Sequence, residues 1–180
     1  MLSAQVRRTC LDRLDALRAR GLEVPKPFDA HALCQSVARC LGHPITLVAV
    51  PMPPGAPSGL TLFTDAANVI VYERHTSRMH QDHIIAHELG HVILGHQALA
   101  LDGAEKIRLL VPSLRPGLVR QVLGRSGTYS ALEEQQAEMM ATLLLEEAGR
   151  CASCPTATAA PSDEELRERL RSSLERPHRS

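Results

Sequence analysis

Aromatic residues, net charge and long apolar runs are all scarce in this sequence of 180 residues. It has two Phe, two Tyr and no Trp, which argues against modules that bind nucleic acid by stacking bases on aromatic side chains. Twenty basic and twenty acidic residues leave a formal net charge of zero, so the chain lacks the electrostatic footprint of proteins that bind phosphate backbones or anionic membranes. We therefore expect neither direct nucleic-acid binding nor membrane binding.

Export signals and membrane spans are also absent from the sequence. The first twenty residues contain five Arg but no apolar segment of the kind found in a signal peptide, and no stretch approaches the roughly 18 apolar residues of a transmembrane helix. Five Cys, an odd number without a secretion signal, do not favour a disulfide framework. These features predict a cytoplasmic protein.

Hydrophobic residues make up 44% of the chain, enough for one domain with a buried core. We divide the chain into an N-terminal helix over 1–27, a core domain over 28–150, and a linker with a C-terminal helix over 151–180. Residues Cys151 and Cys154 form a single CxxC pair within the linker-like stretch, where we expect no structural zinc site because a second pair is absent.

Apolar periodicity and breaker residues predict the secondary structure of the core. Spacing of 3.6 residues predicts helices over 3–20, 29–41, 77–94, 114–123 and 130–149. Short β-branched runs predict strands over 45–50, 60–63 and 69–72, the last two as an antiparallel hairpin. The expected class is α+β, a small and mostly helical domain with a three-stranded, largely antiparallel sheet packed on the helix over 77–94.

The most informative segment is the sequence HELGH at 87–91, which has the pattern H-E-x-x-H. His87 and His91 are one helical turn apart on one face, so both imidazoles can reach one metal ion while Glu88 lies beside it. The apolar residues of the segment cluster on the opposite helix face, which lets the helix bury one side and present the other to a cleft. This arrangement is typical of zinc hydrolases and predicts Glu88 as the catalytic base.

A catalytic zinc site usually has a third protein ligand. The metzincin continuation fails, because Leu94 and Gln97 stand where a Gly and a third His are required. His80 and His83 share the metal face, but a linear array of ligands would strain a tetrahedral site, so we expect them to line the cleft. His96 falls on the opposite helix face and is expected to be a helix-end or core histidine.

The helix expected over 130–149 offers three carboxylates as the third ligand. Glu133 lies at the third position of a capping box that begins at Ser130, which gives it a local role. Glu134 lies on an apolar stripe, where a carboxylate needs a cation, and Glu138 one turn later suits the orientation of a ligand. We favour Glu134, although all three side chains also fit an acidic first turn that the helix dipole favours.

Together, these motifs resemble those of the ImmA/IrrE family of metallopeptidases. In that family an H-E-x-x-H helix precedes a helix of pattern E-x-x-A-x-x-F-A, which here corresponds to EQQAEMMA at 134–141 with Met140 at the usual Phe position. The resemblance covers residues 28–150 and implies a zincin-like fold. It also implies a Zn²⁺ site formed by His87, His91 and Glu134, with Glu88 as the catalytic residue.

The same resemblance implies an activity and a class of substrate. It predicts a zinc metalloendopeptidase that cleaves a helix-turn-helix transcriptional repressor at a specific site. Tyr129, His80 and His83 are candidates for stabilising the oxyanion, and the strand over 69–72 is a candidate for binding an extended peptide by strand addition. Two alternatives are a regulatory or toxin-like protein-binding module with a structural or vestigial zinc site, and a metal-dependent hydrolase of non-peptide substrates.

Overall fold

The computed structural model describes residues 2–52, 55–64, 66–96, 119–124 and 129–149. The helices of this part are α1 (Leu2–Arg18), α2 (Ala30–Leu41), α3 (Arg78–Leu94) and α5 (Ala131–Glu147). Its strands are β1 (Ile45–Val50), β2 (Gly59–Thr64), β3 (Asn68–Glu73) and β4 (Val119–Gly124). The predicted α+β class is confirmed, and the predicted C-terminal helix and CxxC pair lie outside the described residues.

Capping residues explain where these helices begin and end. The Asp29 side chain accepts a hydrogen bond from the backbone N–H of Ala32 at 2.9 Å, and Gly42 ends α2 with a φ of 70°. Ser130 and Glu133 form the predicted capping box at the start of α5. Local hydrogen bonds therefore define these helix boundaries.

The four strands form one mixed sheet in the order β1-β3-β2-β4. The predicted hairpin is confirmed, because β2 pairs antiparallel with β3. Strand β1 pairs parallel with β3, and β4 pairs antiparallel with β2, so two of the three pairings are antiparallel. Because β3 lies between β1 and β2, it has no open edge, and the proposal that it binds a peptide by strand addition is wrong.

The prediction of a helix over 114–123 is also wrong for the residues of this range that the structure describes. Residues Val119–Gly124 form β4, whose backbone pairs with β2 in a register that places Val122 opposite Leu62. A short apolar segment carries no decisive period of its own, so pairing with a partner strand decides its structure. Residues 114–118 lie outside the described part of the chain.

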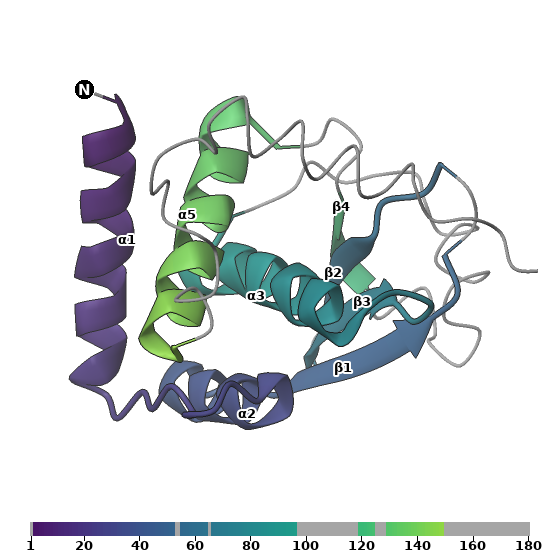
Figure 1. Cartoon of the computed structure of the whole chain (residues 1–180), viewed down its shortest axis with the longest axis horizontal. Coiled ribbons are helices and arrows are strands. Elements are labelled where there is room, and N and C mark those ends of the chain that lie inside the picture. The colour runs from purple at the N-terminus through teal and green to yellow at the C-terminus, as the bar shows by residue number, and fades with distance from the viewer. Residues whose placement is uncertain (1, 53–54, 65, 97–118, 125–128, 150–180) are drawn as a thin grey trace, which may run out of the picture.

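Helix α3 lies between the sheet and α5, as Figure 1 shows, and α1 stands along the outer side of α5. The main core joins apolar side chains of all four helices with Ile70 from β3. A smaller cluster on the other side of the sheet contains Leu60, Leu62, Val69 and Val71. None of the helices in the described ranges combines the length and the apolar character that spanning a bilayer requires.

Candidate metal centre

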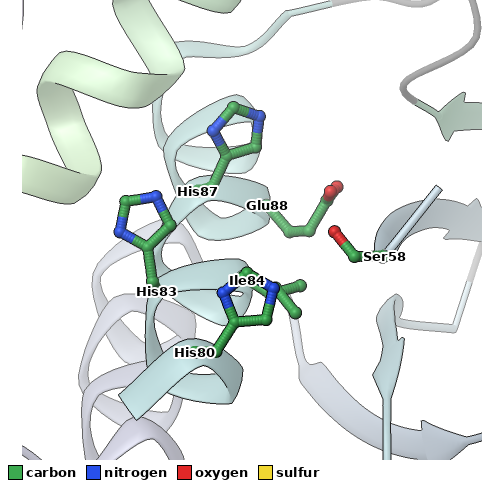
Figure 2. Close-up of a pocket in the computed structure, with 6 residues that line it drawn as sticks. All are labelled: Ser58, His80, His83, Ile84, His87 and Glu88. Carbon is green, nitrogen blue, oxygen red and sulfur yellow. The ribbon is translucent and has the colours of Figure 1, made fainter. Parts of the chain in front are cut away.

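Helix α3 buries the three candidate site residues of the HELGH motif. His87 and Glu88 are each 3% exposed and His91 is 1% exposed. The Ser77 side chain accepts a hydrogen bond from the backbone N–H of His80 and so defines the start of the helix. This start lies about two and a half turns before the motif. In Figure 2 the imidazole of His87 lies on one side of α3 while Glu88 extends across toward Ser58.

Helix α5 adds a carboxylate to the two imidazoles. His87 Nε2 lies 3.2 Å from His91 Nε2 and 3.4 Å from Glu134 Oε2. Each of these three residues offers a ligand atom, and the three atoms lie within 4.8 Å of one another. No other group of three His, Cys, Asp or Glu in the described part of the chain is placed to hold a metal ion.

The distances between these atoms fit a zinc ion. Bonds of about 2.0–2.1 Å in a tetrahedral site place neighbouring ligand atoms about 3.3 Å apart, close to the two separations of 3.2 and 3.4 Å found around His87 Nε2. Two imidazole nitrogens and one carboxylate oxygen are also a common donor set for catalytic zinc. His87, His91 and Glu134 are therefore a group that could hold a zinc ion.

The orientation of His87 supports the same conclusion. Its Nδ1 lies 3.2 Å from Glu138 Oε2, and an ionised carboxylate can only accept, so Nδ1–H is the donor. In the neutral ring, Nε2 then presents a lone pair to Glu134 and to His91 Nε2. A lone pair that faces a carboxylate oxygen at 3.4 Å is an arrangement that a cation between the two atoms would stabilise.

The other two candidate carboxylates have separate roles in the structure. Glu133 accepts from the Ser130 backbone N–H at 2.9 Å within the capping box. Glu138 accepts from His83 Nε2 and from His87 Nδ1, each at 3.2 Å. Hydrogen bonds from these two imidazoles hold the pKa of the Glu138 carboxyl well below its usual range. Of the three, only Glu134 points its oxygen at the pair of Nε2 atoms.

Strand β2 holds the Glu88 carboxylate from the opposite side. Thr61 Oγ1 donates to Glu88 Oε2 at 3.0 Å. A Cβ added to Gly59 would lie 2.9 Å from Glu88 Oε1 and 2.5 Å from Ile84 Cγ2. The absence of a side chain at Gly59 therefore makes room for the carboxylate beside the strand.

Comparison with known families points in the same direction. Residues 40–110 match the family model Peptidase_M78, described as the IrrE N-terminal-like domain. Residues 40–110 are therefore similar to the IrrE N-terminal-like domain. The match confirms the resemblance to ImmA/IrrE metallopeptidases, and its range includes His87, Glu88 and His91 but not Glu134. No curated protein gives a significant match to the chain.

A cavity of about 240 Å³ opens beside the HELGH motif. It is lined by Ser58, His80, His83, Ile84, His87 and Glu88, which Figure 2 shows around one side of α3. The prediction that His80 and His83 line a cleft is therefore confirmed. Ser58, which joins the cavity from the start of β2, carries no sequence motif that would have marked it.

Tyr129 extends the site on the side of His91. Its ring stacks on the His91 imidazole, with centroids 4.1 Å apart and planes inclined by 22°. The hydroxyl is buried and has no hydrogen-bond partner among the residues that the structure describes. Burial raises the pKa of this phenol, and the negative charge of Glu88 adds to the effect, so the hydroxyl keeps its proton.

His96 lies just past the end of α3 and is buried, so the prediction of a helix-end or core histidine is confirmed, but the helix face predicted for it is wrong. We expected it on the face of the helix away from the metal ligands, but its Nδ1 lies 3.0 Å from His91 Nδ1. The helix pattern does not continue to this residue, because Gly95 ends α3 with a φ of 69° and turns the chain back. A position after a left-handed glycine cannot be placed on a helical wheel.

Gly90 lets α3 and α5 approach each other closely beside the candidate metal site. A Cβ at this position would lie 2.9 Å from the backbone oxygen of Ala137 and 3.2 Å from its Cα. Ala137 is buried on α5, less than one turn after Glu134. The distance between α3 and the third ligand therefore depends on the missing side chain.

We expect Gly90→Ala to weaken both folding and metal binding. Because backbone atoms of α5 cannot rotate away, the added methyl group should lower the free energy of unfolding by about 1–3 kcal/mol. The same displacement moves Glu134 from the two Nε2 atoms. Chemical denaturation and zinc titration measure the two effects, with Gln135→Ala at an exposed site on α5 as the control. Wild-type stability and affinity in Gly90→Ala would contradict this account of the contact.

Proposed function

We propose that this protein is a zinc-dependent endopeptidase in which His87, His91 and Glu134 hold the metal and Glu88 is the catalytic base. One observation carries the proposal. Three ligand atoms from two helices lie within 4.8 Å of one another beside a buried carboxylate that a strand holds in place. The match to the Peptidase_M78 model supports peptide hydrolysis over the hydrolysis of other substrates.

Zinc, when bound, would polarise the scissile carbonyl and lower the pKa of the attacking water. Glu88 accepts the proton of that water at its carboxylate and delivers it to the nitrogen of the leaving amine. The Thr61 hydroxyl orients the carboxylate by donating to Oε2. The Tyr129 hydroxyl, buried and protonated beside His91, is our candidate donor to the developing oxyanion.

We further propose that the substrate is a helix-turn-helix transcriptional repressor, cleaved at one exposed or locally unfolded segment in the cytoplasm. The resemblance to ImmA/IrrE metallopeptidases supports the substrate class. Three cysteines in the described part of the chain are free thiols, which is in keeping with a reducing compartment. A net charge of zero argues that any effect on transcription passes through another protein.

The test is to incubate the zinc-loaded protein with the helix-turn-helix repressors encoded beside its gene and to follow their masses and their retention on operator DNA. We expect one cut in one repressor, loss of DNA retention, and little cleavage of casein. Two half-sites are read together only by an intact dimer, so a cut that removes the dimer contacts releases the DNA. Release of DNA by Glu88→Gln without a change in repressor mass would replace the peptidase with the protein-binding module.

A further inference from the structure

A chain of three polar side chains runs from α5 to the metal centre. Gln136 Oε1 lies 3.0 Å from His96 Nε2, and His96 Nδ1 lies 3.0 Å from His91 Nδ1. His91 in turn places its Nε2 3.2 Å from His87 Nε2, on the side of the metal site. His96 is 8% exposed and His91 1% exposed, so the two imidazoles are shielded from water, whereas Gln136 is half-buried.

The backbone at the end of α3 creates the contact between the two imidazoles. The N–H of Gly95 donates to Val92 O at 3.2 Å, and the N–H of His96 donates to His91 O at 3.1 Å. These two bonds are those of a Schellman motif, in which the residue after the left-handed glycine packs against the residue five positions earlier. That contact is usually hydrophobic, whereas here it joins two imidazoles.

The direction of the protons along the chain decides whether His91 can bind a metal. A carbonyl oxygen only accepts, so Gln136 Oε1 requires the proton of neutral His96 to be on Nε2. His96 Nδ1 is then an acceptor, and His91 must donate to it from Nδ1–H. The neutral His91 ring consequently presents the lone pair of Nε2 toward His87 and Glu134. If the protons ran the other way, His91 Nε2 would carry hydrogen and could not ligate.

We propose that His96 and Gln136 are positioning residues that hold His91 in the Nδ1–H form required for metal binding. The proposal rests on the proposed metal site and adds to it a carboxamide–imidazole–imidazole relay. Such partners orient the ring of a ligand and fix its tautomer. Tyr129 stacks on the same ring, so the plane and the proton of His91 are held by different neighbours.

Two variants of the full chain test the relay. Gln136→Met removes the acceptor while keeping the length of the side chain, and His96→Phe keeps a ring but removes both nitrogens. Each should weaken zinc binding, measured by competition with a chelator, by about 10- to 100-fold. Gln136→Glu should retain wild-type affinity, because a carboxylate also only accepts. The matched control is Gln135→Met, at the exposed neighbouring position, which should leave the affinity unchanged.

A measurement on the metal-free protein tests the relay independently of the proposed function. Long-range ¹H–¹⁵N correlation spectra of the metal-free protein should show His91 protonated on Nδ1 in the wild type and not in Gln136→Met. His91 protonated on Nε2 in the wild type, or unchanged zinc affinity in both Gln136→Met and His96→Phe, would overturn the relay. If instead the wild-type protein bound no zinc while His91 kept its Nδ1 proton, the proposed function would fail and the assignment of the tautomer would stand.

Discussion

Glu88→Gln is expected to lose peptide cleavage by about 10² to 10⁴-fold while keeping its metal and its fold. The substitution keeps the shape of the side chain, so the space beside Gly59 still accommodates it. The amide oxygen can still accept from the Thr61 hydroxyl as Oε2 does now. What is lost is the basic oxygen that takes the proton of water and passes it to the leaving amine.

Three measurements on the Glu88→Gln protein check this result. Cleavage is followed by substrate mass, metal content by elemental analysis, and stability by thermal unfolding. Thr61→Val is the matched variant, because it removes the donor of the hydrogen bond to Glu88. It keeps the base but orients it less precisely, so we expect a smaller loss of cleavage than in Glu88→Gln. Loss of metal from Glu88→Gln would show that Glu88 is a ligand, in contradiction to the role assigned here.

Glu134→Ala is expected to produce the largest loss of zinc among substitutions of the acidic residues of α5. The carboxylate oxygen of Glu134 lies 3.4 Å from His87 Nε2 and completes the donor set. Its removal should weaken zinc binding by more than the loss of about 10- to 100-fold that is typical when a residue that hydrogen-bonds to a metal ligand is changed. His91→Ala should behave in the same way, because it removes a ligand from α3. Zinc titration in competition with a chelator measures both.

The neighbouring carboxylates provide graded controls for Glu134→Ala. Glu138→Ala should weaken zinc binding by about 10- to 100-fold, because His87 loses the acceptor that orients it. Glu133→Ala should retain the affinity and lose only some helix stability, because Glu133 closes the capping box. If Glu133→Ala removed the metal and Glu134→Ala retained it, the third ligand would have to be reassigned.

Local chemistry made most of the fold predictable from sequence. The starts of α2, α3 and α5 depend on Asp29, Ser77 and Ser130, whose side chains accept from nearby backbone N–H groups. Strand β4 was not predicted, because its structure depends on pairing with β2, which lies far away in the sequence. A local pattern cannot contain that information, and the short apolar segment was interpreted as a helix.

The same distinction applies to the candidate site. The spacing of His87 and His91 places them together in any helix, and the apolar stripe around Glu134 indicated the third carboxylate. Gly59 and Thr61 were missed because a strand had to be docked on α3 before they could reach Glu88. The helix face of His96 was predicted wrongly, although Gly95 could have indicated the right position. A glycine at a helix end predicts a Schellman motif, in which the residue after the glycine contacts the residue five positions earlier.

The distribution of the three ligand atoms over α3 and α5 has a consequence for the lifetime of the proposed enzyme. The two helices are distant in sequence, so only the native chain presents the complete donor set. A ligand that binds the native but not the unfolded chain stabilises it by mass action, and the gain grows with the logarithm of the ligand concentration. If the proposed site holds zinc, we therefore expect zinc supply to raise the resistance of the chain to proteolysis, and scarcity of the metal to lower the amount of folded protein as well as its activity.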